Sequence, residues 1–448
     1  MTTGLSAQNI TGEDLERIRE SFEKSPENTA MQNIISNSPD LKSLALNREL
    51  QGKIDHYFKY RVNVSGITDQ ESSGRCWMFT SMNVLRPAVM KKFNISSFDF
   101  SHNFCYFWDI FEKSNLFLEN VIATAEKDIL MDRDVAFYFQ SPVSDGGVWN
   151  SFLNIAEKYG AVPADVMPET VHSIATRSLV NLLNEYLRIE GYRLKSLASE
   201  KMNRKKAEER KMEIMKGVYR ILALCLGEPP VEFTWRYQDT DGAIKTLETT
   251  PMDFYRSIIP DNYGSGNYIM VMHDPTRAYY KVYEISNYRN CYEGVNWKYL
   301  NLPIEEIKTS AITSIKSDEA LYTSSDVGKF HNTAEGVSDP DLYNYSALFG
   351  LEITDNDKKS RILTRQSGSS HAMALIAVDT DKNGKPTKWQ MENSWGPTAG
   401  HGGYLTVTDK WLTEYLFRIV INKKYLSTKA ISALKSEPVI LPAWDYMF

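Results

Sequence analysis

A cysteine at the expected start of a helix is the feature that most restricts what this chain can fold into. The loop 72–74 precedes Cys76, and a run that suits a helix follows from Trp77. At a helix N-terminus a cysteine feels the positive end of the helix dipole, which favours the thiolate. Gln70 stands shortly before it and could donate its side-chain amide to an oxyanion beside the sulfur. Taken alone, the pattern also fits a buried structural cysteine.

A histidine and an asparagine far along the chain supply the groups that a nucleophilic cysteine needs. An apolar run typical of a buried strand begins at His371, and a turn at 382–385 leads to a second strand that ends at Asn393. The two side chains should therefore lie near the ends of adjacent strands. Asn393 can hold one ring nitrogen and leave the other for Cys76. Together these residues predict a Cys-His-Asn catalytic site, with Gln70 as the oxyanion donor.

Several short motifs occur in a fixed order from about residue 60 to the C-terminus. They are Gln70 with Ser72–Trp77, Asp145–Gly147, Lys158–Pro163, Met167–Thr170, Asp326–Lys329, Ser370–Met373, Asn393–Gly396 and Leu441–Asp445. In these motifs the chain resembles the aminopeptidase C and bleomycin hydrolase family of papain-like cysteine peptidases. The resemblance implies an α+β, papain-like fold with a helical half and a β-barrel-like half. We expect a helical insertion and an N-terminal arm in addition.

The resemblance also implies roles for residues around the catalytic group. Asp145, Gly146 and Gly147 are expected to bind substrate, because two adjacent glycines let another backbone approach closely. A peptide would pair with them as a short added strand. Trp77 and Trp395 are expected to support the site, the latter by shielding the hydrogen bond of the catalytic histidine from water.

The C-terminal tail decides where a peptide would be cut. In the family the tail lies in the cleft, and its terminal carboxylate meets the free amine of the substrate, which makes the enzyme an aminopeptidase. This chain ends at Phe448, a few residues short of the family's usual tail, with Tyr446 in place of a proline. We predict aminopeptidase activity with Phe448 in the substrate site. An oligo-endopeptidase of the same fold is the alternative, because a shorter tail leaves room for longer peptides.

The spacing of the catalytic residues predicts the domain organisation. Cys76 and His371 are further apart than the roughly 130–150 residues of a simple papain-like chain, so extra residues must lie between them. We expect five segments: an N-terminal arm (1–60), the cysteine-helix half (61–175), a mainly helical insertion (176–265), the His/Asn barrel half (266–435) and the tail (436–448). The resemblance further implies a homohexameric barrel whose active sites face an internal channel.

The expected insertion contains a basic cluster that allows a different function. Its members are Lys201, Arg204, Lys205, Lys206, Arg210 and Lys211. Such a run is usually a solvated helix face, but it could also attract nucleic-acid phosphates. Nearby glutamates dilute the positive charge. A nucleic-acid-binding protein is therefore kept only as a second alternative.

Composition narrows the class of protein further. The 448 residues are 42% hydrophobic and 24% charged with a net charge of −6, values typical of a soluble globular protein. The chain has four cysteines, too few for a disulfide framework, and shows neither a signal peptide nor an apolar run near the ~20 residues of a membrane span. We therefore expect a cytoplasmic enzyme with peptide substrates and no membrane partner. The seven histidines are scattered, so we expect no metal, and the chemistry needs no cofactor.

Overall fold

The computed structural model describes residues 9–199, 204–260, 263–353 and 356–446. The chain divides into two compact units, one of residues 1–51 with 341–355 and the other of residues 52–340 with 356–448. No pattern in the sequence indicates that a segment after residue 340 joins the N-terminal arm.

The smaller unit is helical. Its helices are α1 (Gly12–Glu20), α2 (Pro26–Asn37), α3 (Leu41–Leu44) and α13 (Tyr345–Phe349). Each begins at a polar side chain that accepts a backbone N–H, as Thr11 does for α1 in a capping box. Two backbone hydrogen bonds join its separate segments: Asn47 N–H donates to the Leu342 carbonyl at 2.8 Å, and Asn344 N–H donates to Ala45 at 2.7 Å.

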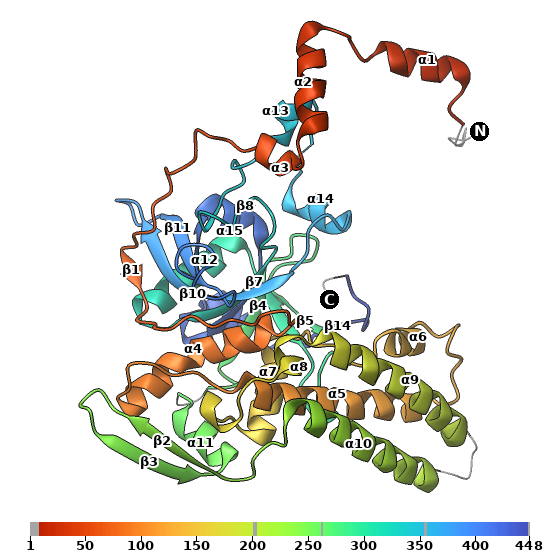
Figure 1. The fold of residues 1–448 in the computed structure, drawn as a ribbon, viewed down its shortest axis with the longest axis vertical. Coiled ribbons are helices and arrows are strands. Elements are labelled where there is room, and N and C mark those ends of the chain that lie inside the picture. The colour runs from red at the N-terminus through yellow and green to blue at the C-terminus, as the bar shows by residue number, and fades with distance from the viewer. Residues whose placement is uncertain (1–8, 200–203, 261–262, 354–355, 447–448) are drawn as a thin grey trace. The chain divides into compact units, whose positions relative to one another are not determined.

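One half of the larger unit consists mainly of helices. They are α4 (Cys76–Phe93), α5 (His102–Ala123), α6 (Arg133–Gln140), α7 (Trp149–Tyr159), the short η1 (Ala164–Val166), α8 (Val171–Ile174), α9 (Arg177–Ser199), α10 (Arg204–Leu226) and α11 (Pro251–Ile258). The hairpin of β2 (Phe233–Gln238) and β3 (Ile244–Thr249) lies with them. Helices α5, α9 and α10 pack side by side (Figure 1). Leu179, Leu183 and Leu187 of α9 are buried at helical spacing.

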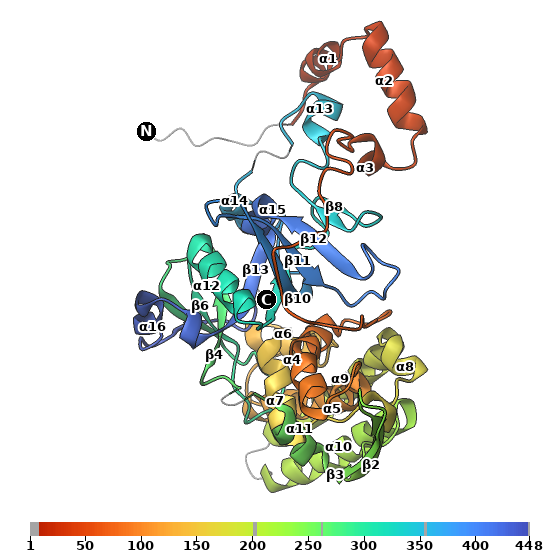
Figure 2. The same ribbon diagram turned by 90° about the vertical axis from the view of Figure 1, so that its left-hand side faces the viewer.

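The other half is built on a 12-stranded sheet of order β14-β5-β6-β4-β13-β7-β10-β11-β12-β9-β8, with β1 paired to β10. The strands are β1 (Tyr60–Arg61), β4 (Tyr268–Met272), β5 (Lys281–Ile285), β6 (Lys298–Asn301), β7 (Leu321–Ser325), β8 (His331–Asn332), β9 (Val337–Ser338), β10 (His371–Thr380), β11 (Pro386–Glu392), β12 (Tyr404–Thr408), β13 (Leu416–Asn422) and β14 (Val439–Leu441). The helical elements of this half are α12 (Ile304–Lys316), α14 (Lys358–Leu363), α15 (Asp409–Tyr415), η2 (Lys423–Tyr425) and α16 (Thr428–Ala433). Figure 2 shows strands β10, β11 and β12 on the opposite side of α4 from α10.

Helix α4 joins the two halves. It packs against β10 and β7 of the sheet and against α7 and α11 of the helical half. Its buried apolar residues are Trp77, Met78, Phe79, Met82, Leu85 and Val89. Strand β10 is buried from His371 to Val378, which explains its unbroken apolar run. Because both elements are buried, their first residues are held firmly where the two halves meet.

Among the described residues, no helix is both long and apolar enough to cross a membrane.

Candidate active site

Cys76 is the first residue of α4, as the sequence predicted. The carbonyl of Arg75 accepts the Met78 N–H at 2.9 Å and so begins the helix. Cys76 is partly exposed, whereas Cys105 and Cys291 are buried. All four cysteines, Cys225 included, are free thiols.

His371 and Asn393 form the predicted hydrogen bond. Nε2 of His371 lies 2.7 Å from Oδ1 of Asn393, with His371 at the start of β10 and Asn393 directly after β11. Strands β10 and β11 pair antiparallel, which brings these two ends together. The Trp395 ring stacks on the imidazole at 4.7 Å between centroids. Trp395 thus covers the ring that Asn393 orients.

The start of β10 lies against the Cys76 side chain. Burial raises the pKa of the Cys76 thiol, although the backbone N–H groups of Ala372 and Trp77 act in the opposite direction. Burial also lowers the pKa of His371 to about 4, against the effect of its hydrogen bond to Asn393. The backbone N–H at the helix N-terminus thus lowers the thiol pKa, as expected, but desolvation of the thiolate has the larger effect.

Gln70 is buried and fixed at both ends of its amide. Oε1 accepts the Ser394 hydroxyl at 2.7 Å, and Nε2 donates to the Ser73 carbonyl at 2.5 Å. The backbone N–H of Gln70 also donates to the Ser394 carbonyl at 2.9 Å. An amide nitrogen carries two N–H groups, so one remains beyond the bond to Ser73.

Asp145 holds the loop that precedes the nucleophile. One carboxylate oxygen accepts the Gly74 N–H at 2.7 Å and also the Thr176 hydroxyl, while the Asp145 carbonyl accepts Trp77 Nε1 at 2.8 Å. A Cβ on Gly74 would meet Oδ1 of Asp145 at 2.5 Å. These contacts engage one carboxylate oxygen with the loop, and a direct contact of Asp145 with substrate stays a prediction.

The glycine pair lies beside Trp77 and is held by a lysine that the sequence analysis missed. Lys113 donates to the carbonyls of Ser144 at 2.8 Å and Gly146 at 2.6 Å, and forms an ion pair with Asp109. A Cβ on Gly147 would lie 2.6 Å from the Trp77 ring, so only glycine fits there. The sequence indicates the role of Lys113 only weakly, because a lysine four residues after an aspartate in a helix usually forms an ion pair on the protein surface.

A cavity of about 130 Å³ adjoins the glycine pair, and we call it the glycine-loop cavity. Gly146, Gly147 and the tail residue Ala443 line it, and half of its remaining wall is aromatic or aliphatic. The last predicted substrate residue, Phe448, lies outside the described residues.

The tail is fixed just beyond this cavity. Arg277 forms an ion pair with Asp445 at 2.5 Å, Tyr446 bonds to the Thr276 hydroxyl, and the Arg133 guanidinium lies 3.3 Å from the Trp444 ring centroid. Strand β14, which leads into the tail, pairs in parallel with β5.

Two further features bear on the expected partners. Among the described residues there is no group of three or more His, Cys, Asp or Glu that could hold a metal ion.

In the basic cluster on α10, Arg210 pairs with Glu190 and Lys211 pairs with Glu119, while Lys201 lies outside the described residues. These ion pairs weaken the argument for nucleic-acid binding, because they neutralise part of the cluster.

The chain is similar to known proteins over almost its whole length. Residues 9–448 match the model of the Peptidase C1-like family. Human bleomycin hydrolase is 35% identical over 99% of both chains, and aminopeptidase C of Lactobacillus delbrueckii subsp. lactis is 37% identical over 88% of both. The crystal structure of PepW from a Lactobacillus strain matches with a TM-score of 0.93 at 34% identity over 98% of both chains.

Proposed function

The chain belongs to the Peptidase C1-like family, and on this premise we propose that Cys76, His371 and Asn393 hydrolyse peptide bonds in it. It is a cysteine peptidase with the papain-like fold of bleomycin hydrolase and aminopeptidase C. The observation that carries the proposed site is the 2.7 Å hydrogen bond between His371 and Asn393 at the strand end that lies against Cys76.

The hydrogen bond to Asn393 determines how the imidazole works. Because Nε2 is held by Asn393, Nδ1 is the nitrogen left to take the thiol proton. The pKa directions favour a neutral thiol and a neutral imidazole before substrate binds. The proton therefore moves to Nδ1 as the sulfur attacks the peptide carbonyl. It then passes to the leaving amine, and water activated by the same nitrogen hydrolyses the thioester.

The negative charge on the attacked carbonyl oxygen needs two donors. The second N–H of Gln70 and the backbone N–H of Cys76 supply them in this proposal. Gln70 is rigid, because Ser73 and Ser394 hold its amide, so it does not have to reorient during the reaction. No metal or cofactor takes part.

We propose an aminopeptidase mode, in which the tail restricts the cleft to the amino end of a peptide. Support comes from Ala443, which lines the same cavity as Gly146 and Gly147. A peptide paired with the glycines would meet the tail after few residues on its amino side. The terminal carboxylate of Phe448 would then bind the free amine.

The other parts of the proposal are a homohexamer with its active sites on an internal channel and a cytoplasmic location.

Replacement of the nucleophile tests the catalytic site. Cys76→Ser should reduce hydrolysis of a free-amine peptide to below about 1% of wild type, because the hydroxyl is far less acidic than the thiol. The control is Cys225→Ser, which changes a partly exposed thiol on α10 and should retain activity. If Cys76→Ser keeps its activity while a thiol reagent inhibits by labelling another cysteine, the wrong nucleophile has been chosen.

Blocking the peptide amine tests the mode of cleavage. The free peptide should be cut faster than its N-acetylated form, and deletion of residues 446–448 should erase that preference while Cys76 stays reactive. Equal rates on both peptides with the intact tail would instead favour an oligo-endopeptidase.

A further inference from the structure

Arg75 places a fully buried charge directly before the nucleophile. Its side chain is 0% exposed, although the next residue is the partly exposed Cys76. Nη1 donates to both carboxylate oxygens of Glu169, at 3.1 and 3.0 Å. The guanidinium also lies over the rings of Phe79 and Tyr106, at 5.2 and 5.4 Å from their centroids. Because two rings and a carboxylate hold it, the guanidinium is fixed in one orientation, and its remaining donors have fixed directions.

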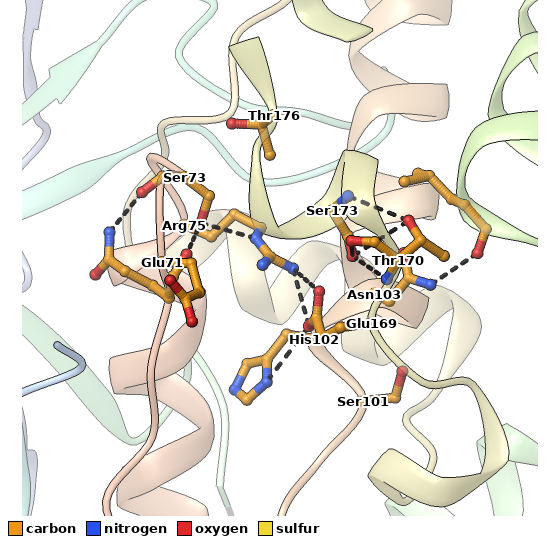
Figure 3. Close-up of polar contacts among 12 residues, drawn as sticks. Glu71, Ser73, Arg75, Ser101, His102, Asn103, Glu169, Thr170, Ser173 and Thr176 are labelled. Carbon is orange, nitrogen blue, oxygen red and sulfur yellow. Dashed lines mark hydrogen bonds and ion pairs between the residues drawn. The ribbon is translucent and has the colours of Figure 1, made fainter. Parts of the chain in front are cut away.

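The Nε donor of Arg75 contacts residues 70–75, which we call the oxyanion loop. Nε donates to the Ser73 hydroxyl at 3.0 Å, and Figure 3 shows Arg75 between Ser73 and Glu169. The same hydroxyl donates to the Gln70 carbonyl at 2.6 Å, while the Ser73 carbonyl accepts Gln70 Nε2 at 2.5 Å. Ser73 therefore connects the guanidinium to both the backbone and the side-chain amide of Gln70.

The oxyanion loop needs such an anchor because its backbone is strained beside Gln70. Glu71 has a φ of 52°, in the left-handed region that few residues other than glycine adopt. A conformation of this kind persists only where surrounding contacts fix it. The Glu71 N–H donates to Asp69 at 2.8 Å, and the two bonds between Ser73 and Gln70 hold the other side. Loss of the bond from Arg75 to Ser73 would remove part of this support.

Cys76 is placed by contacts that do not involve the Arg75 side chain. Helix α4 begins with backbone bonds, in which the Arg75 carbonyl accepts the N–H groups of Met78 and Phe79 at 2.9 and 3.1 Å. The helix then packs against β10 and α7. A change confined to the guanidinium should therefore move Gln70 more than it moves the sulfur.

We propose that Arg75 is a positioning residue for the oxyanion donor Gln70 and acts through the Ser73 hydroxyl. The inference rests on the proposed peptidase function. The guanidinium keeps the second N–H of Gln70 directed at the carbonyl oxygen that gains negative charge. This effect belongs to the transition state and not to substrate binding, so it should alter kcat and leave KM nearly unchanged.

Substitution of the guanidinium tests this role. Arg75→Gln should lower kcat about 10- to 100-fold with little change in KM, because a misplaced donor stabilises the oxyanion poorly. Arg75→Lys keeps the charge but lacks the planar fork of donors, and it should lose activity as well. Ser73→Ala keeps the buried ion pair, removes only the connecting hydroxyl, and should lower kcat about fivefold.

The matched control is a buried arginine that does not contact the oxyanion loop. Arg361 is 7% exposed, and it donates to the Asn356 carbonyl and to the Glu414 carboxylate. Arg361→Gln therefore removes a comparable buried ion pair and should leave kcat unchanged.

Two further measurements separate the donor from the nucleophile. Alkylation of Cys76 by iodoacetamide displaces iodide from a saturated carbon and forms no oxyanion, so Arg75→Gln should leave its rate unchanged. In a Gln70→Ala background, Arg75→Gln should lower kcat by less than about threefold, because the donor that it positions is absent.

Four outcomes would overturn the inference. They are equal losses of kcat in both backgrounds, full activity in Arg75→Lys, an alkylation rate that falls in parallel with kcat, and unchanged kcat in Ser73→Ala. The last outcome decides even where Arg75→Gln does not fold.

A peptide aldehyde separates this inference from the catalytic proposal. The Cys76 sulfur forms a bond to the aldehyde carbon, the thiol proton passes to the aldehyde oxygen, and no group leaves. Calorimetry therefore reports on the oxyanion site without turnover. Arg75→Gln should weaken aldehyde binding about 10-fold and leave binding of the matched, unreactive peptide alcohol unchanged. Equal aldehyde affinities would contradict the role of Arg75. If wild type shows this aldehyde result but cuts no peptide, the peptidase proposal fails and the role of Arg75 stands.

Discussion

Asp145 shows how one side chain can govern a nucleophile that it does not touch. Its carboxylate holds Gly74, two residues before Cys76, and its carbonyl holds the Trp77 indole. It therefore connects the loop that ends in Cys76 to the loop that carries the glycine pair. A shift of either loop would move the sulfur relative to a bound peptide.

Replacing Asp145 should lower turnover more than substrate binding. We expect Asp145→Ala to reduce kcat about 10- to 100-fold with a small change in KM, because misplacement of about 1 Å at the reacting atoms has effects of this size. Asp145→Asn keeps an acceptor for Gly74 and should lose less. The alkylation rate of Cys76 should fall in parallel. A change in KM alone would indicate that Asp145 contacts the substrate instead.

The titration of His371 predicts the acid limb of the pH profile. Its pKa of about 4 is depressed by burial and partly restored by Asn393, so the ring is a neutral base above that pH and is protonated below it. For a small uncharged peptide, kcat/KM should fall as the pH drops through about 4. In Asn393→Ala the limb should move to lower pH, because the hydrogen bond that raises the pKa is gone. An acid limb near pH 6.5 in wild type would contradict this assignment.

At the scale of elements, the sequence predicted most of what positions the site. The apolar runs and turns identified α4, β10 and β11, since burial and hydrogen bonding leave a clear local pattern. The contacts of Lys113 and Arg75 were not predictable, because each joins segments that are distant in the chain. The net direction of the shift in the thiol pKa was not predictable for a related reason. The helix start is visible in the sequence, but the burial around Cys76 depends on the whole fold.

A buried ion pair between α4 and β11 should make the fold sensitive to the loss of one partner. Arg86 and Glu392 are 1% and 0% exposed at the side chain, and burial raises the pKa of Glu392 to about 7, although Arg86 opposes this. Arg86→Met leaves a buried carboxylate alone and should lower the unfolding free energy by about 3–5 kcal/mol at pH 8. Urea denaturation measures the unfolding free energy of each variant. The double variant Arg86→Met/Glu392→Leu should recover part of the stability that the single variant loses. An unchanged midpoint in the single variant would contradict the argument.

The same pair gives stability a pH dependence with a definite sign. The folded pKa of Glu392 lies above its unfolded value, so the stabilisation that comes from protonated Glu392 is fully present below about pH 4.5 and is lost as the pH rises through about 7. Glu392→Gln should flatten this part of the stability profile.

At the scale of the whole molecule, the sequence predicted the fold class and the order of the motifs, and the family comparison agrees with both. The division into five segments stays a prediction. The discontinuous smaller unit could not have been foreseen, because residues 341–355 carry no pattern that marks them as part of the arm. Pairing between distant segments is set by tertiary contacts, which leave little trace in local sequence.

The proposed homohexamer is tested by light scattering on the full chain. The mass should be six times the 51.3 kDa of one chain at micromolar concentration. Removal of the first 51 residues should shift the population towards smaller species, if the arm holds subunits together. A monomer mass for the intact chain would reject the assembly, although it would leave the catalytic proposal standing.

The backbone hydrogen bonds from Asn47 and Asn344 have a consequence for synthesis. A ribosome releases the first helices long before it makes the segment around residue 344 that completes their unit. At roughly 5–20 residues per second, this wait lasts about 15–60 s. During that time the backbone groups of residues 45 and 47 have no partner from the returning segment, although helices α1, α2 and α3 bury no residue even in the folded chain. Chaperones that bind nascent chains should therefore find the apolar side chains of this arm accessible from the start.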